Sequence, residues 1–227
     1  MEAKEKLTFG ALFAYPEHSI CSAWLTSFAY LWQAFDELGD FIRKTGATLP
    51  PDVYERQGED VWIARDVEIA PTATLTGPLI VCPGAKIRPG AFIRGNVVVG
   101  AGAVVGNSTE LKSCILFDGV EVPHFNYVGD SILGYRAHLG AGAVTSNIKS
   151  DRKNVVVHLG NETIETGRRK LGALLGDYAE VGCNSVLNPG TVIGRHATVY
   201  PLSSVRGYVP GGHIYKTTGN VVKKRDE

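Results

Sequence analysis

The sequence has no excess of either charge and contains no long apolar run. Lysine plus arginine and aspartate plus glutamate both number 23, so the formal net charge is zero. Neutralising the phosphates of nucleic acid requires a basic excess, so nucleic acid is excluded as the main partner. The longest apolar stretches fall well short of the roughly 18 residues of a transmembrane helix, which predicts no membrane partner.

Cysteine is scarce and scattered as well. The four cysteines lie far apart, form no C-x-x-C pair and follow no secretory signal: Cys21, Cys82, Cys114 and Cys183. Thiols spaced in this way are typical of a reducing compartment, where they stay free or become buried. The sequence therefore predicts a cytoplasmic protein.

Glycine, in contrast, is abundant, with 27 residues against a single methionine. Aliphatic residues recur at every sixth position, apart from two five-residue steps and one long interruption. They are Ile63, Ile69, Leu75, Val81, Ile87, Ile93, Val99, Val105, Leu111, Leu116, Val122, Val128, Leu133, Leu139, Leu175, Val181, Leu187, Ile193, Val199 and Val205. A small or modest side chain usually follows four residues later, and glycine often follows directly.

A six-residue repeat is typical of a parallel β-helix, in which each hexad supplies one short strand and one turn. The aliphatic side chain points into a narrow interior, and the residue four places later lies near a corner and has to be small. Glycine suits the turns because it reaches positive φ without a Cβ penalty. The repeat therefore predicts an all-β fold for residues 63–210.

Three segments depart from the repeat. Residues 1–62 are predicted to be helical, because Trp24, Phe28, Leu31, Phe35, Leu38 and Ile42 alternate four and three apart on one helix face. Such a helix is expected to cap the open end of the β-helix, and its aromatic residues leave a partner or lid role open. Residues 146–174 are an insertion, with a hairpin expected between Val155–His158 and Glu162–Glu165. Residues 211–227 form a C-terminal strand and a basic tail.

One histidine stands out on the repeat. Val122 and Val128 are interior positions, so His124 is predicted to project outward from its coil, as is Tyr127. Imidazole titrates near neutral pH and is suited to general-base chemistry. From spacing alone, a solvated histidine without a chemical role is the alternative.

A resemblance to a known family rests on H-x-x-Y-x-G-D at residues 124–130 and GAGAVTSN at residues 140–147. Over roughly residues 62–215 the chain resembles the hexapeptide-repeat acetyltransferase domain of bacterial and archaeal sugar-1-phosphate nucleotidylyltransferase/acetyltransferases, which include N-acetylglucosamine-1-phosphate uridyltransferase. The resemblance implies a left-handed parallel β-helix in which three hexads close one triangular coil. The aliphatic positions above and Thr145 make 21 hexads, which predict about seven coils.

The resemblance also implies roles for particular residues. His124 matches the general base that takes a proton from the sugar amine. The matches to substrate-binding residues are Arg94, Lys112, Tyr127, Asn147 and Lys153, and those to positions facing acetyl-CoA are Ala141, Cys183 and Pro201. His138 departs from the family, which has asparagine there. By composition alone, the three cations are equally expected to be solvated, Tyr127 to pack between neighbouring prisms and Asn147 to occupy a turn.

The implied function is acetyl-CoA-dependent N-acetyl transfer to an amino-sugar phosphate such as glucosamine 1-phosphate, in sugar-nucleotide biosynthesis. The family places this site between subunits of a homotrimer. No G-x-G-T-R motif is present, so no nucleotidyl transfer is expected from this chain alone.

Two alternatives remain open at this point. The chain could be a non-catalytic, sugar-nucleotide-binding or regulatory β-helix related to UDP-N-acetylglucosamine pyrophosphorylases. A zinc enzyme of the carbonic-anhydrase type shares the expected fold but needs two histidines a few residues apart. The six histidines here include no such pair, so no metal is expected.

Overall fold

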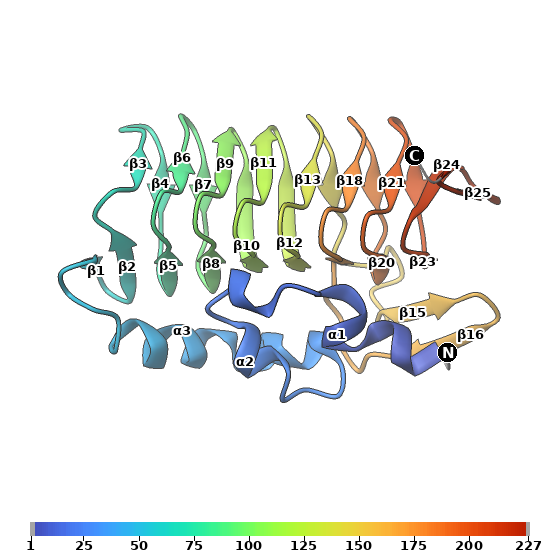
Figure 1. Ribbon diagram of the computed structural model, residues 1–227, viewed down its shortest axis with the longest axis horizontal. Coiled ribbons are helices and arrows are strands. Elements are labelled where there is room, and N and C mark those ends of the chain that lie inside the picture. The colour runs from blue at the N-terminus through green and yellow to red at the C-terminus, as the bar shows by residue number, and fades with distance from the viewer. Residues whose placement is uncertain (1–2, 226–227) are drawn as a thin grey trace.

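The computed structural model describes residues 3–225, in which a set of short helices lies alongside a long β-helix (Figure 1). Three ladders of parallel strands run the length of the β-helix and meet at three edges. Each chain turn visits the three ladders in the same order, which stacks residues about 4.8 Å apart.

The first ladder, called the covered face, contains the strands β2 (Val61–Ala64), β5 (Leu79–Val81), β8 (Val97–Val99), β10 (Glu110–Leu116), β12 (Tyr127–Leu133), β17 (Ala173–Leu175), β20 (Thr191–Ile193) and β23 (Tyr208–Val209). The second, the β3–β24 face, contains β3 (Glu68–Ile69), β6 (Lys86–Ile87), β9 (Val104–Asn107), β11 (Glu121–His124), β13 (His138–Leu139), β18 (Glu180–Val181), β21 (Thr198–Val199) and β24 (His213–Thr217).

The third ladder, the β4–β22 face, contains β4 (Thr74–Leu75), β7 (Phe92–Ile93), the first parts of β10 and β12, β14 (Val144–Thr145), β19 (Val186–Leu187) and β22 (Ser204–Val205). Over the described residues, each of the first two ladders has more strands than the seven coils expected. The hexad count missed β23 and β24 as parts of additional coils, because Tyr208–Val209 and His213–Thr217 fall outside the six-residue register.

The interior is as narrow as the repeat predicted. The aliphatic positions from Val81 to Val205 are at most 2% exposed, and small residues such as Ala85 and Ala103 are fully buried between them. Burial of this kind stabilises each coil by the hydrophobic effect, and parallel-strand hydrogen bonds to the coils above and below hold the register.

The glycines that directly follow the aliphatics serve a different purpose from the one expected. Positive φ occurs three residues after the aliphatic, for example at Gly84 and Gly102. Gly106 and Gly182 keep ordinary φ, but a Cβ at Gly106 would lie 1.6 Å from the Pro123 carbonyl oxygen. Close approach of successive coils, and not left-handed backbone, therefore requires glycine there.

The N-terminal segment contains six short helices in the described residues: η1 (Ala3–Leu7), α1 (Phe9–Leu12), η2 (Pro16–His18), α2 (Ser22–Leu25), η3 (Leu31–Asp36) and α3 (Leu38–Gly46). The single helix expected through residues 24–42 was therefore wrong. The side chains of Thr26 and Ser27 donate hydrogen bonds to the carbonyls of Ala23 and Trp24 and compete with helix continuation.

The expected position of this segment was also wrong. It lies along the covered face and not over an end of the β-helix (Figure 1). The amide of Asp177 donates to the Leu12 carbonyl at 3.0 Å, and the amide of Ala14 donates to the Asp177 carboxylate at 2.6 Å. Farther along the same face, α3 contacts β5 and β8.

The outward residues of the covered face explain this arrangement. The residue before each interior aliphatic on this face is itself apolar and buried: Trp62, Ile80, Val98, Ile115, Ile132, Leu174 and Val192. A strand that is apolar on both sides needs a cover on each. Apolar residues at two consecutive positions in every third hexad were the signal in the sequence that the hexad analysis passed over.

The insertion and the tail each form a hairpin. Strands β15 (Val156–Leu159) and β16 (Glu162–Glu165) pair antiparallel, so the predicted hairpin is present with its first strand one residue later. At the C-terminus, β25 (Asn220–Lys223) pairs antiparallel with β24, and at the other end β1 (Tyr54–Gly58) pairs with β2.

All four cysteines are free, as predicted. Burial raises the pKa of the Cys82 thiol to about 12 and also raises the pKa of the Cys21 and Cys114 thiols. These three are therefore inert core residues, whereas Cys183 is exposed. No helix within residues 3–225 is long and apolar enough to cross a bilayer.

Two valines at the same hexad position test the cover. Val98 is 1% exposed beneath the N-terminal segment, and Val186 is 37% exposed on the β4–β22 face. Val98→Ala should lower the free energy of unfolding by about 2 kcal/mol, because buried methyl groups and their contacts are lost. Val186→Ala should cost less than about 1 kcal/mol. Urea denaturation followed by circular dichroism measures both, and equal losses would contradict the arrangement.

Candidate functional site

His124 ends β11 and lies on the edge between the β3–β24 face and the β4–β22 face. Hydrogen bonds stack this edge in a fixed order: the Gly142 amide donates to the His124 carbonyl at 3.0 Å, the Asn184 amide to Ala141 at 2.8 Å, and the Leu202 amide to Cys183 at 2.9 Å. The fold thus brings His124 onto one column with the three positions predicted to face acetyl-CoA: Ala141, Cys183 and Pro201. We call this column the His124 edge.

A buried amide fixes the backbone at His124. The Asn126 side chain accepts from the His124 amide at 3.1 Å and donates to the carbonyls of Gly140 and Ala143 at 2.9 and 3.0 Å. Asn126 is 2% exposed and ties two successive corners together. The sequence carried a signal for it, because Asn126 occupies the position four residues after an interior aliphatic, where most other hexads have a small or aliphatic residue.

The His124 side chain itself is exposed and borders a shallow cavity of about 430 Å³. The cavity is lined by Arg88, Val104, Glu121, Pro123, His124, His138, Gly140, Ala141 and Cys183. Within residues 3–225 no hydrogen bond or ion pair engages the His124 ring, whereas the His138 ring lies 3.0 Å from a Glu180 carboxylate oxygen. In the described residues, both ring nitrogens of His124 are therefore without a partner, whereas Nδ1 of His138 is paired with Glu180.

A second polar cluster lies on the edge between the β4–β22 face and the covered face, which we call the Lys112 edge. The Lys112 ammonium donates to both carboxylate oxygens of Asp130, at 3.0 and 3.2 Å. The Asn147 amide donates to Asp130 at 2.6 Å and to the Tyr127 hydroxyl at 3.1 Å. Three of the predicted substrate-binding residues therefore meet around one buried carboxylate.

Asp130 is the residue of this cluster that sequence reasoning did not assign. Its side chain is 5% exposed, and its backbone has a φ of 46° at the second five-residue step of the repeat. The shortened step makes β12 run continuously around the corner, which directs the carboxylate onto Lys112. The G-D of the motif at residues 124–130 was the available signal.

Arg94 and Lys153 are placed differently from the other candidates. Arg94 stands one coil before Lys112 on the same edge, but its guanidinium donates to the Glu110 carboxylate at 2.7 Å. Lys153 lies in the insertion, and its amide donates to Asp151 at 3.0 Å. Among residues 3–225, no contact links the Lys153 side chain to the cluster around Asp130.

Tyr127 connects the two edges. It begins β12 on the β4–β22 face, around the corner from His124, and its hydroxyl reaches the Asn147 amide. Burial raises the pKa of the Tyr127 phenol, while the hydrogen bond from Asn147 lowers it. The Tyr127 hydroxyl therefore stays protonated near neutral pH, and it presents a neutral hydrogen-bond donor near the Arg94 guanidinium. The His124 imidazole and the Lys112 ammonium therefore lie on the two edges of the β4–β22 face, which the N-terminal segment does not cover.

No group of three or more histidine, cysteine, aspartate or glutamate side chains capable of holding a metal occurs within the described part of the chain. Of the two histidines that line the cavity, His138 has its Nδ1 paired with the Glu180 carboxylate at 3.0 Å.

Removing Asp130 tests the cluster. Asp130→Ala should lower the free energy of unfolding by about 3 kcal/mol, because the Lys112 ammonium and the Asn147 amide lose a shared buried acceptor. The exposed pair of Arg94 and Glu110 is the matched control, and Glu110→Ala should cost less than about 1 kcal/mol. Urea denaturation measures both, and adding Lys112→Met to Asp130→Ala should recover part of the loss. Equal costs for the two single variants would contradict the cluster.

The GMPPB C-terminal domain family matches residues 75–165. A bifunctional sugar-1-phosphate nucleotidylyltransferase/acetyltransferase of Sulfurisphaera tokodaii is 38% identical over 112 residues, which are 49% of this chain and 28% of that protein. A bifunctional protein GlmU of Methanococcus maripaludis is 35% identical over 150 residues, covering 58% of this chain and 36% of that protein. The chain thus spans roughly a third of the length of the curated relatives that it matches.

Among solved structures, the acetyltransferase domain of PglB from Neisseria gonorrhoeae aligns with 66% of this chain and 54% of that one, at 16% identity and a TM-score of 0.33. A superposition this loose supports no conclusion about fold or function. The family match spans residues 75–165, which include the strands that carry Lys112, His124 and Asp130. Over 49–58% of its length, the chain is thus similar in sequence to part of bifunctional sugar-1-phosphate nucleotidylyltransferase/acetyltransferases of the GlmU type.

Proposed function

We propose that the chain is an acyltransferase that moves the acetyl group of acetyl-CoA onto the amine of an amino-sugar phosphate, with His124 as general base. The observation that carries this proposal is the His124 edge, where an imidazole that has no partner among residues 3–225 heads a column of small or exposed residues. The similarity to the bifunctional sugar-1-phosphate nucleotidylyltransferase/acetyltransferase of Sulfurisphaera tokodaii supports the same chemistry.

The His124 edge is suited to a long, thin co-substrate. Ala141 and Cys183 have small side chains, and a Cβ at Gly140 would lie 2.7 Å from the Cys183 amide nitrogen. The corner therefore stays shallow, and a thioester can lie along it beside the His124 ring. Residues with larger side chains at these positions would fill the groove.

The chemistry needs one proton to be moved. The amine nitrogen attacks the thioester carbonyl and forms the C–N bond, while the imidazole of His124 accepts the proton from nitrogen. Collapse of the tetrahedral adduct breaks the C–S bond, and the imidazolium returns the proton to the leaving thiolate. The products are the amide and coenzyme A.

On the acceptor side, the Lys112 edge supplies the charge that a phosphate requires. Lys112 and Arg94 stand on adjacent coils, and their pairing with Asp130 and Glu110 keeps both cations positioned. A sugar phosphate would share Lys112 with Asp130 and displace water from the half-exposed Arg94. Tyr127 and Asn147 then face the sugar hydroxyl groups, and Lys153 reaches the site from the insertion of the same or a neighbouring subunit.

The first test replaces the base. His124→Asn should lower kcat for glucosamine 1-phosphate by about 10²–10⁴-fold, because the amine loses its proton acceptor. Release of coenzyme A, followed with a thiol reagent, measures the rate. Calorimetric titration should show that glucosamine 1-phosphate still binds within about threefold of the original affinity.

The control is His196→Asn, an exposed histidine at a corner of the edge away from the proposed site. It should transfer acetyl groups at the unaltered rate. Full activity of His124→Asn would remove the general-base role. A wild-type chain that binds the sugar phosphate but releases no coenzyme A would instead establish the non-catalytic, sugar-nucleotide-binding alternative.

The proposal extends to a homotrimer with the His124 edge against a neighbouring copy. Phe125 and Leu202 stand on this edge with φ of 52° and 58°, and they are 63% and 81% exposed. A bulky side chain in the left-handed region costs on the order of 1–3 kcal/mol. Exposing that side chain to water compounds the cost, whereas contact with a second copy of the chain offsets it.

Glycine at both positions tests the interface. Phe125→Gly combined with Leu202→Gly should stabilise the isolated chain by about 1 kcal/mol, because glycine suits positive φ. The same variant should dissociate from trimer to monomer at micromolar concentration in sedimentation equilibrium. Asn184→Gly, at an exposed position with a φ of 54° on the same edge, is the matched control and should stay trimeric. A trimer unaffected by the double variant would contradict the interface.

A further inference from the structure

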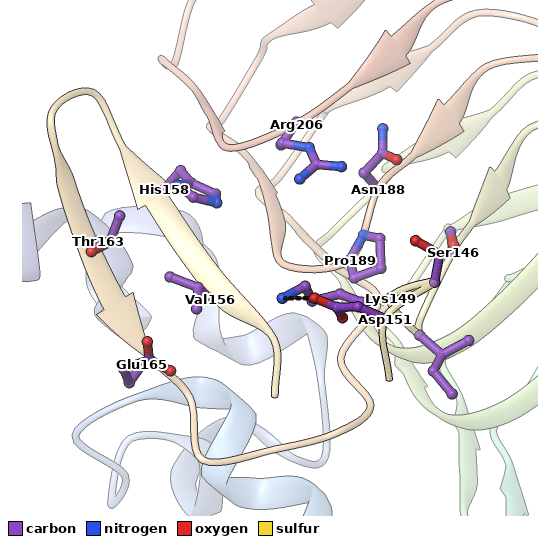
Figure 2. Close-up of a pocket in the computed structure, with 12 residues that line it drawn as sticks. Ser146, Lys149, Asp151, Val156, His158, Thr163, Glu165, Asn188, Pro189 and Arg206 are labelled. Atoms are coloured by element: carbon purple, nitrogen blue, oxygen red, sulfur yellow. Dashed lines mark ion pairs between the residues drawn. The ribbon is translucent and has the colours of Figure 1, made fainter. Parts of the chain in front are cut away.

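A large polar cavity lies beside the β15–β16 hairpin, and no predicted site residue lines it. It has a volume of about 740 Å³ and is enclosed between the β15–β16 hairpin, the Lys112 edge near the C-terminal coils and the start of the insertion (Figure 2). Neither the proposed acetyl transfer nor any predicted site residue uses it. Its lining combines cations, carboxylates and hydroxyls.

The hairpin presents one defined face to this cavity. Val155 and Val157 are fully buried against the β-helix, and Ile164 packs against the same core. Because side chains alternate along a strand, the intervening residues turn the other way. His158 stands opposite Thr163 in the hairpin register. Of the four hairpin residues that line the cavity, three are polar (His158, Thr163 and Glu165) and one is Val156.

The facing wall comes from the Lys112 edge. The Asn188 amide donates both hydrogens within the β-helix, to Ser204 and to the Val205 carbonyl, which leaves its oxygen to accept from a ligand. Arg206 follows one coil later. Within residues 3–225 neither the Arg206 guanidinium nor the His158 ring has a hydrogen bond or ion pair, and both point into the same space (Figure 2).

The cationic and anionic side chains that line the cavity lie at different ends of it. Lys149 is held by Asp151 at 3.3 Å, so this pair contributes little net charge. Arg206 and His158 lie at one end, and Glu165 lies at the far end of the hairpin face (Figure 2). An unpaired guanidinium fork matches a phosphate, and a carboxylate with neighbouring hydroxyl groups accepts hydrogen bonds from a polyol.

We infer that this cavity is a second ligand site, which binds a phosphorylated sugar with its phosphate between Arg206 and His158 and its hydroxyls toward Asn188 and Glu165. Among the residues that the structure describes, no phenylalanine, tyrosine or tryptophan lines the cavity, so these residues offer no platform on which a nucleotide base would stack. The ligand class is therefore a sugar phosphate and not a nucleotide.

This site is distinct from the proposed acceptor site. On the Lys112 edge, the residues that stack between Lys112 and Arg206 are Gly129, Ser146 and Asn188, as the strand registers require. Four steps of about 4.8 Å separate the two cations by roughly 19 Å. The insertion that borders the second site (residues 146–174) includes Asn147, which donates to Asp130, so a ligand there also restrains the segment attached to the Asp130 cluster.

Hydrogen exchange of the full chain tests the inference without any activity measurement. Millimolar glucose 1-phosphate at low ionic strength should slow amide exchange in residues 156–165 at least fivefold. The protection should persist in Lys112→Gln, because that substitution alters only the acceptor site, and should disappear in Arg206→Gln. Arg169→Gln, an exposed arginine of the same insertion that does not line the cavity, is the matched control and should behave as the wild type.

Two further probes separate the parts of the ligand. Inorganic phosphate should protect the hairpin more weakly than glucose 1-phosphate, and glucose alone should not protect it. Absence of protection in the wild type, or protection that survives Arg206→Gln, would overturn the second site. Loss of protection in Lys112→Gln would assign the effect to the acceptor site and equally reject the inference.

Discussion

Each coil of the β-helix has to lie in register on the coil below, because the interior holds only one aliphatic side chain and one small side chain per hexad. This constraint converts a repeat in the sequence into columns in space. Residues that occupy the same hexad position on one face become neighbours about 4.8 Å apart, whatever their separation along the chain. The His124 edge and the Lys112 edge are two such columns, and every contact proposed above is a consequence of their register.

Polar function in this scaffold collects where the repeat is broken. The two five-residue steps carry β10 and β12 continuously around a corner. The second step places the Asp130 carboxylate between Lys112 on the preceding coil and Asn147 on the following coil, and both donate to it. Asn126 interrupts the row of small corner residues and fixes the His124 backbone. Phe125 holds a bulky side chain in a backbone conformation that favours glycine. Departures from a local rule that the rest of the fold sustains are typical of functional positions.

The cations of the Lys112 edge differ in what holds them. Lys112 shares a carboxylate that is almost fully buried, Arg94 is paired with a half-exposed glutamate, and Arg206 has no partner in the described residues. A phosphate at Lys112 competes with Asp130 for the same ammonium, whereas a phosphate at Arg206 meets an unoccupied guanidinium. The two proposed anion sites therefore make different demands on one column, and the insertion at residues 146–174, which contains Asn147, joins them.

The six-residue period determined the β-helix, its interior residues and the outward direction of His124, because a narrow core tolerates few side chains. The H-x-x-Y-x-G-D motif also indicated which outward residues to consider. The sequence did not determine where the first 62 residues lie, since apolar periodicity identifies a buried face but not the surface that covers it. Only the tertiary structure decided that they lie on the covered face, that Asp130 gathers Lys112 and Asn147, and that the insertion closes a cavity over Arg206. These are contacts between segments far apart in the chain, and no local pattern encodes them.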